Sequence, residues 1–250
     1  MVPASLLAAV LIVCRSRTQG RSLAYTDFSY EAASPGRPGT GGRLERVLLR
    51  FTKEDDIRFV GHLDLMRMLE RAMRRSRFPI AYSQGFNPRP RMAFASALTL
   101  GATSEWELCQ LDLASDLEER ALREAVAALR PQLPEGMRIL NVWPLPVQKR
   151  NGCIQVLAAT YTLTCEGIEG GGAVREFLQS GAGLPQARDW AWTEQNGVLV
   201  LQLTLPVGER TGVRIRDAIA TLEEGVPGLR VTRLHRARLW CEQEPEATSL

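Results

Sequence analysis

The stretch HLDLMRMLERAMRRS, residues 62–76, decides the fold of the N-terminal half of the chain. On a helix with about 100° per residue, its apolar side chains fall on one side and most of its arginines on the other. The apolar side consists of Leu65, Met66, Leu69, Ala72 and Met73, and the opposite side carries Arg67, Arg71, Arg74 and Arg75. This pattern predicts an amphipathic helix over residues 62–76 whose apolar side faces a core.

Strands are expected on both sides of this helix. RVLLRF (46–51) is rich in β-branched and aromatic residues, and IRFV (57–60) is predicted to be a short continuation of the same strand. PIAYSQ (79–84) and RMAFAS (91–96) lie on either side of a loop, and WELCQLDL (106–113) alternates strictly between polar and apolar residues. Glu105 and Glu107 flank Trp106 and are expected to face solvent.

A second amphipathic helix and a further strand complete this half. DLEERALREAVAALRPQL (116–133) has helical periodicity, with Asp116 as the expected N-cap and Glu119 as its partner in a capping box. MRILNVWPL (137–145) follows as a strand. The predicted order is therefore β-α-β-β-α-β, which is the order of the ferredoxin-like fold.

The C-terminal half repeats this pattern more faintly. Its predicted elements are a strand at 153–165, a helix at 171–180, a hairpin at 188–205 that turns at Asn196-Gly197, a helix at 214–225 and a strand at 228–241. The expected fold class is thus α+β, with two tandem ferredoxin-like domains. We place them at 44–147, which includes the long helix, and at 153–243, joined near PLPVQKRNG (144–152).

Residues 1–43 are predicted to be a disordered extension. SLLAAVLIVC (5–14) is too short an apolar run to span a bilayer. SPGRPGTGG (34–42) has the composition of an unstructured segment. No membrane partner is expected.

The charge of the chain is concentrated in one window. The net charge is only +3, but residues 58–91 contain eight arginines against two acids. Only two of the 31 basic residues are lysines, Lys53 and Lys149. Arginine binds phosphate and carboxylate groups through its planar fork, so the window predicts an anion-binding surface that includes Arg58. A solvated helix face in an arginine-biased sequence is the alternative.

Cysteine and histidine usage argues against a metal site or cofactor. The five cysteines lack C-x-x-C spacing and also the C-x-x-x-C-x-x-C spacing of a radical enzyme's iron–sulfur cluster. Their odd number and scattered positions are typical of reduced thiols in a cytoplasmic protein. The chain has two histidines, His62 and His235. We therefore expect no metal and no cofactor.

The loop YSQGFNPRPR (82–91) is the strongest candidate for recognition. Asn87-Pro88 and Arg89-Pro90 restrict its backbone. Tyr82 and Phe86 offer stacking faces, Gln84 and Asn87 offer amides, and Arg89 and Arg91 offer guanidinium groups. The loop is expected to face RNA or another phosphate-bearing ligand. The alternative is a loop that packs for structure, with Tyr82 and Phe86 in the core.

His62 is the candidate catalytic residue. It lies at the junction of the first predicted strand and the helix. Histidine titrates near neutral pH, so His62 can act as a general acid or base. It can also hold a phosphate group at the helix N-terminus. The alternative is that His62 and Asp64 only cap the helix.

The whole segment RFVGHLDLMRMLERAMRRSRFPIAYSQGFNPRPRMAFA (58–95), followed by LGATSEWE (100–107), resembles the signature of the radical-SAM-linked proteins. This bacterial family, a domain of unknown function, occurs beside a radical S-adenosylmethionine (radical SAM) protein or fused to its C-terminus. The resemblance covers residues 45–245 and implies a radical SAM partner. Two positions depart from the family pattern: Arg89 replaces a histidine and Ala97 replaces a proline.

Three functions are compatible with the sequence. The first is a non-catalytic accessory protein that recognises structured RNA, such as transfer or ribosomal RNA, or another anionic substrate for a radical SAM partner. The second is a metal-independent RNA-processing enzyme that uses His62 as acid or base, by fold analogy alone. The third is a structural scaffold for the partner.

Overall fold

A computed structural model describes residues 44–145, 154–168, 170–181, 184, 187–195, 198–208 and 212–242. Residues Arg43–Leu250 form one compact unit. The predicted extension (1–43), most of the predicted junction (144–152) and the Asn196-Gly197 turn lie outside the described residues. None of the helices in the described ranges is long and apolar enough to cross a membrane.

The first half of the unit follows the order strand, helix, strand, strand, helix, strand. Its elements are β1 (Leu44–Lys53), the 3-10 helix η2 (Asp55–Phe59), α2 (His62–Ser76), β2 (Met92–Phe94), β3 (Thr103–Leu117), α3 (Glu119–Leu129), the 3-10 helix η3 (Arg130–Gln132) and β4 (Ile139–Pro144). The predicted helix over 62–76 is confirmed with the same bounds.

The second half has the same order of strands and helices. Its elements are β5 (Val156–Glu166), α4 (Gly172–Gln179), β6 (Asp189–Gln195), β7 (Val198–Pro206), α5 (Ile215–Gly225) and β8 (Arg230–Cys241). With four α-helices and a sheet among the described residues, the fold class is α+β, as predicted.

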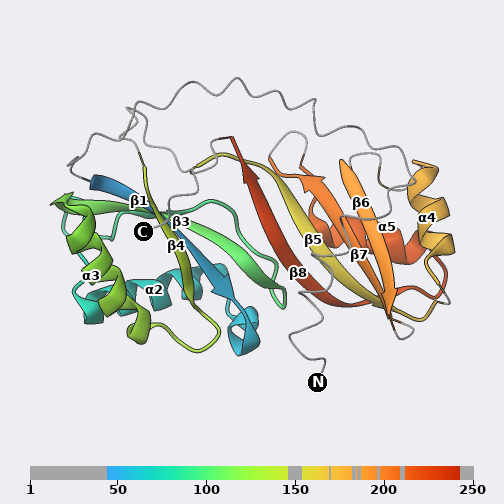
Figure 1. Cartoon of the computed structure of the whole chain (residues 1–250), viewed down its shortest axis with the longest axis horizontal. Coiled ribbons are helices and arrows are strands. Elements are labelled where there is room, and N and C mark those ends of the chain that lie inside the picture. Colours follow the sequence, from blue (N-terminus) through green and yellow to red (C-terminus); the bar gives the residue numbers. More distant parts are fainter. Residues whose placement is uncertain are drawn as a thin grey trace. The chain divides into compact units, whose positions relative to one another are not determined.

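All of the strands belong to one eight-stranded sheet (Figure 1). Its order is β4-β1-β3-β8-β5-β7-β6, and β2 pairs with β3 off this path. In each half, the first strand lies between the third and the fourth, and the second pairs with the third, all antiparallel. The two halves join where β3 and β8 pair in parallel, at Thr103 with His235 and at Ser104 with Arg236.

The helices of the two halves pack over two core clusters, and the second cluster also includes Leu48, Leu108 and Trp143 of the first half. In the first half, Val47, Leu49 and Phe51 of β1 pack in one cluster with the apolar side of α2. That side buries Leu65, Leu69, Ala72 and Met73, while Met66 is only partly buried. In the second half, Leu199, Leu201, Leu203 and Leu205 of β7 cluster with Ile215, Ala218 and Leu222 of α5. Because side chains alternate along a strand, the other residues of β1, such as Arg50, lie on the opposite face of the sheet.

Two local predictions are wrong. Residues 57–60 do not continue the first strand, because the chain leaves β1 after Lys53 and turns into η2, with Asp55 at a positive φ of 48°. Asp116 does not cap the second helix, because β3 runs on to Leu117 and the N-cap of α3 is Glu118. At Asp116 the strand forms instead of the capping box, since the next residue, Leu117, still pairs with Leu44 of β1.

The short strand β2 positions the 82–91 loop at the edge of the first half. The chain meets β3 at an isolated bridge between Ile80 and Leu113, leaves it, and rejoins it where Met92 pairs with Leu111. Asp112 of β3 holds both arms of the excursion: its carbonyl accepts from Ala81 N–H at 2.9 Å and its N–H donates to the Arg91 carbonyl at 3.0 Å. The loop is therefore an excursion from one sheet edge.

Candidate functional site

The 82–91 loop is held at its base by a small ladder of backbone hydrogen bonds. Ser83 N–H donates to the Arg89 carbonyl and Arg91 N–H donates to the Ala81 carbonyl, both at 2.8 Å. The Ser83 hydroxyl oxygen also accepts from Arg89 N–H at 3.0 Å. These bonds define the stem of a hairpin, so the side chains between Ser83 and Arg89 sit on an anchored tip.

The tip of the loop presents its side chains to solvent. Phe86 has a relative exposure of 106% and Tyr82 of 37%, and Gln84, Asn87 and Arg89 are also exposed. Gly85, beside Phe86, has a φ of +136°, which L side chains rarely adopt, and thus permits the turn. The alternative in which Tyr82 and Phe86 pack in the core is therefore wrong.

The outer arginines of α2 are largely engaged by neighbours. Arg67 pairs with Asp64 and Arg74 with Glu70, each at 3.0 Å. Arg75 donates to the side-chain oxygen of Gln132 at 3.1 Å and to its carbonyl at 2.6 Å, which ties α2 to η3. Within the described part of the chain, Arg71 has no such partner. The helix face is therefore less positive than its four arginines suggest.

A shallow depression of about 400 Å³ lies between α2 and the segment after α3. It is lined by Met68, Arg71, Arg75, Gln132, Leu133 and Pro134. Two of the predicted anion-binding arginines thus share one concave surface.

Arg58 and Arg91 also have local partners. Arg58 lies with its guanidinium carbon 4.6 Å from the centre of the Phe59 ring. Arg91 pairs with Asp112 at 3.0 Å, and the same carboxylate pairs with Arg46 at 2.7 Å. Asp112 therefore neutralises much of the charge at the base of the loop.

His62 is the first residue of α2, and its ring packs edge-on against Phe94 of β2, with 5.2 Å between ring centres. The N-cap is Gly61, without a side-chain hydrogen bond, and Asp64 pairs with Arg67, so the capping alternative is wrong. The described residues hold no group of three His, Cys, Asp or Glu side chains suited to a metal ion.

The contacts of the described residues do not join the outer arginines of α2 to the loop. Arg75 donates to the Gln132 carbonyl of η3, whereas the loop leads into β2, which pairs with β3. A single cleft between the two elements therefore stays a prediction.

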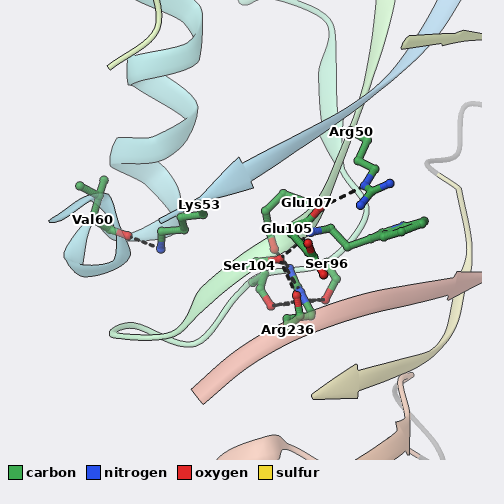
Figure 2. A network of polar contacts seen from close by, with 10 residues as sticks. Arg50, Lys53, Val60, Ser96, Ser104, Glu105, Glu107 and Arg236 are labelled. Carbon is green, nitrogen blue, oxygen red and sulfur yellow. Dashed lines mark hydrogen bonds and ion pairs between the residues drawn. The ribbon is translucent and has the colours of Figure 1, made fainter. Parts of the chain in front are cut away.

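A polar network missed by sequence reasoning lies where the two halves meet (Figure 2). Arg236 of β8 is 1% exposed and donates through Nε to the Glu107 carboxylate of β3 at 3.1 Å. Its Nη2 reaches the same oxygen, and its Nη1 donates to Ser96 Oγ at 3.2 Å. The Ser104 hydroxyl donates to the Arg236 carbonyl at 3.2 Å. The expectation that Glu107 faces solvent is therefore wrong.

Lys53 ends β1 beside this network. Its ammonium group donates to the Val60 carbonyl at 2.8 Å, and the residue is 2% exposed. Burial lowers the pKa of Lys53, the Glu107 carboxylate raises it, and the Arg236 guanidinium lowers it. The three charged groups together fix the turn before α2 and the crossing of β3 and β8.

One sequence signal did point to a buried Glu107. It has the same parity along β3 as Cys109 and Leu111, which lie in the core beneath the helices. The partner on β8 carries no comparable signal.

A family model described as an uncharacterized protein conserved in bacteria (DUF2344) matches residues 46–243. The chain belongs to this family. A comparison with curated proteins gives no significant match.

Several solved structures match the chain at low sequence identity and low TM-score. An H/ACA ribonucleoprotein bound to a substrate RNA containing 2′-deoxyuridine matches with a TM-score of 0.44 and 10% identity, over 79% of this chain and 49% of that chain. An archaeal box H/ACA Nop10–Cbf5 complex gives 0.44 and 12%, over 80% and 50%. An unknown protein from Galdieria sulphuraria gives 0.24 and 14%, over 77% and 98%. The chain thus spans about half the length of the ribonucleoprotein chains.

Proposed function

We propose that this DUF2344 chain is an RNA-binding protein and that the 82–91 loop is its main recognition element. The observation that carries the proposal is the fully exposed Phe86 ring on an anchored hairpin tip. Unpaired bases stack on such rings, and each stacked base contributes about 1–3 kcal/mol. The amides of Gln84 and Asn87 supply base-edge contacts beside the ring.

The charge that accompanies this ring supports an anionic ligand. The Arg89 side chain is exposed beside Phe86, and Tyr82 adds a second aromatic face. On α2, Arg71 and Arg75 line the depression next to Leu133. The full proposed set of RNA or anion contacts is Arg58, Arg67, Arg71, Arg74, Arg75, Tyr82, Gln84, Asn87, Arg89 and Arg91. Of these, Arg58, Arg71, Arg75 and Arg89 pair with no carboxylate among the described residues, so their guanidinium groups need not leave an acidic neighbour first.

The two halves of the unit are proposed to be tandem ferredoxin-like domains, at 44–147 and 153–243. Support comes from the identical β-α-β-β-α-β order and from the strand orders β4-β1-β3-β2 and β8-β5-β7-β6. The compartment is proposed to be the cytoplasm, since the five cysteines are odd in number and scattered along the sequence, as is typical of reduced thiols.

The partner is proposed to be a radical SAM protein, on the resemblance of residues 58–107. In this proposal the chain is non-catalytic and presents RNA to the partner, because its cysteines lack the spacing of the cluster ligands. Co-purification with and without ribonuclease distinguishes the roles. Loss of the partner after ribonuclease indicates a shared RNA, and retention indicates the direct contact of a scaffold.

The proposal is tested by fluorescence anisotropy with transfer RNA and ribosomal RNA fragments over a range of salt. Phe86→Ala is expected to weaken binding roughly tenfold or more, because one stacked base is lost. Replacing Gln84 and Asn87 by alanine is expected to reduce the preference among RNAs and leave the salt dependence unchanged, since amides release no counterions. Arg175→Gln on the exposed side of α4 is the control.

Two outcomes contradict the proposal. The first is that the wild-type chain binds none of these RNAs at low salt. The second is that binding persists unchanged in Phe86→Ala and in the amide variant. Cleavage of the RNA in the presence of chelator, abolished by His62→Ala, would instead indicate the metal-independent enzyme.

A further inference from the structure

The depression between α2 and the segment after α3 has one wall that is formed by a single side of α2. Met68, Arg71 and Arg75 are three and four positions apart, so they lie on the same side of the helix. The other wall is formed by residues 132–134. We call this space of about 400 Å³ the α2 depression. Its volume lies within the range of pockets that hold one small ligand.

The wall after α3 is fixed at both of its ends. At its start, Arg75 donates through Nε and Nη2 to the side chain and the carbonyl of Gln132, at 3.1 and 2.6 Å. At its far end, the Gly136 carbonyl accepts from Glu54 N–H at 2.9 Å and from the Thr52 hydroxyl at 3.0 Å. The wall is therefore in place before a ligand binds, which lowers the entropic cost of binding.

The surface between the two walls is mainly apolar. Met68 and Leu133 pack with their inner sides against the core cluster of the first half and remain partly exposed. Pro134 beside them is also partly exposed. Ligand sites commonly combine apolar surface of this kind with a few polar groups that fix the orientation of the ligand.

Two guanidinium groups at the α2 depression have donors that are not used. Arg71 is exposed and has no hydrogen-bond or ion-pair partner within the described ranges. Arg75 uses Nε and Nη2 on Gln132, so the two N–H bonds of its Nη1 have no partner among the described residues. Because Gln132 fixes the plane of the Arg75 guanidinium group, its free edge is oriented in advance.

In the part of the chain that the structure describes, no carboxylate neutralises these two arginines. Glu70, which precedes Arg71, pairs with Arg74 at 3.0 Å. Glu135, which follows Pro134, is exposed and forms no ion pair with either arginine. The α2 depression thus offers positive charge without a counter-charge next to apolar surface. An anion that carries an apolar group fits both features.

We propose that the α2 depression binds a terminal nucleotide of RNA, with the phosphate monoester on Arg71 and Arg75 and the base against Met68 and Leu133. This inference rests on the proposed function and names the part of the RNA that α2 recognises. A phosphate monoester has a charge of about −1.5 to −2 at neutral pH and three acceptor oxygens. A backbone diester carries a single negative charge. Two arginines without acidic partners therefore favour a chain end over the interior of a strand.

The experiment measures the fluorescence anisotropy of a short oligouridylate, labelled at an internal base, in three forms. One form has a 5′-phosphate, one has a 3′-phosphate, and one has hydroxyl groups at both ends. The wild-type chain is expected to bind one phosphorylated form roughly tenfold more tightly than the hydroxyl form, because charge-assisted hydrogen bonds are added. A gain for either phosphorylated form supports the inference and identifies the bound end.

The variants test whether the α2 depression causes this preference. Arg71→Gln is expected to remove most of it without a loss of stability, since the side chain is exposed. Arg71→Lys keeps the charge, loses the planar fork and should retain part of the preference. The control Arg175→Gln on α4 should leave it unchanged. Phe86→Ala should weaken the binding of all three forms alike, so the ratio of their affinities stays the same.

Equal binding of the three forms, in a chain whose RNA binding still depends on Phe86, would overturn this inference and leave the proposed function standing. A preference that survives in Arg71→Gln would mean that another site binds the phosphate, and would overturn it too. Uridine monophosphate that competes as well as the phosphorylated oligouridylate would show a mononucleotide site and overturn the assignment to RNA. If the wild-type chain binds none of the forms at low salt, both proposals are wrong.

Discussion

Replacing Glu107 by leucine is expected to destabilise the chain more than any surface change. The side chains of Arg236 and Glu107 are 1% and 2% exposed, so the change leaves a buried guanidinium group without its counter-charge. Breaking a buried pair from one side costs about 3–5 kcal/mol. Arg236 keeps Ser96 Oγ at 3.2 Å and the Ala97 carbonyl at 3.4 Å as neutral acceptors. We therefore expect the lower end, about 3 kcal/mol, because those acceptors offset part of the desolvation.

Urea denaturation and thermal melting, both followed by circular dichroism, measure this loss of stability. For a unit of this size, each kcal/mol lowers Tm by about 2–4 °C, so Tm should fall by roughly 6–12 °C. The double variant Glu107→Leu, Arg236→Met removes both charges and is expected to be more stable than Glu107→Leu alone. The control is Glu124→Leu, which breaks an exposed pair with Arg120 on α3 and should cost less than about 1 kcal/mol.

Two results would refute the reasoning. One is a Glu107→Leu chain that unfolds within about 0.5 kcal/mol of the wild type, the range of ordinary surface changes. The other is a double variant whose loss equals the sum of the single losses, because residues that form one buried pair should be strongly coupled.

Two further predictions concern stability. Leu69→Asp should unfold the first half, because Leu69 is 2% exposed on the buried side of α2 and an unpaired buried carboxylate costs several kcal/mol; a wild-type melting curve would contradict this. Acid should weaken the fold through Glu105, because His235 and then Arg50 hold the pKa of this carboxyl below its ordinary value despite its burial. Its contribution is present at neutral pH and lost as pH falls below about 4.5. Glu105→Gln should show a smaller loss of urea midpoint over that range, and an equal loss would refute the assignment.

The elements were predictable from the sequence where one face is buried along a long segment. The helix over 62–76 has four apolar residues against the sheet and a clear polar side, so its bounds and its buried face follow from periodicity. The 57–60 segment shows the limit. Only Ile57 of its apolar residues is buried, and a run this short has no period that separates strand from 3-10 helix.

The buried polar network of Glu107 and Arg236 was not predictable in the same way. Parity along β3 places Glu107 on the buried side, but its partner Arg236 lies 129 residues away. A single sequence carries no signal for such a pair.

Several arginines of the chain are engaged by acidic residues of the fold. Arg236 is buried with Glu107, Arg46 and Arg91 share Asp112, and Arg74 pairs with Glu70. The formal charge of residues 58–91 is therefore larger than the charge that is available to bind a ligand.

The pairing of these arginines with carboxylates predicts the salt dependence of RNA binding. If the ligand-facing arginines are the four of the proposed set without a carboxylate partner among the described residues, Arg58, Arg71, Arg75 and Arg89, four phosphate contacts of about 0.7 each give a slope of roughly −3 for a single strand. A slope near −6 would require all eight arginines of residues 58–91 to reach phosphates. The paired ones would then have to leave Asp64, Glu70 and Asp112 on binding. Measuring the affinity for a labelled oligouridylate across salt decides between the two, and the steep result would mean that the paired arginines leave their carboxylates and bind the RNA.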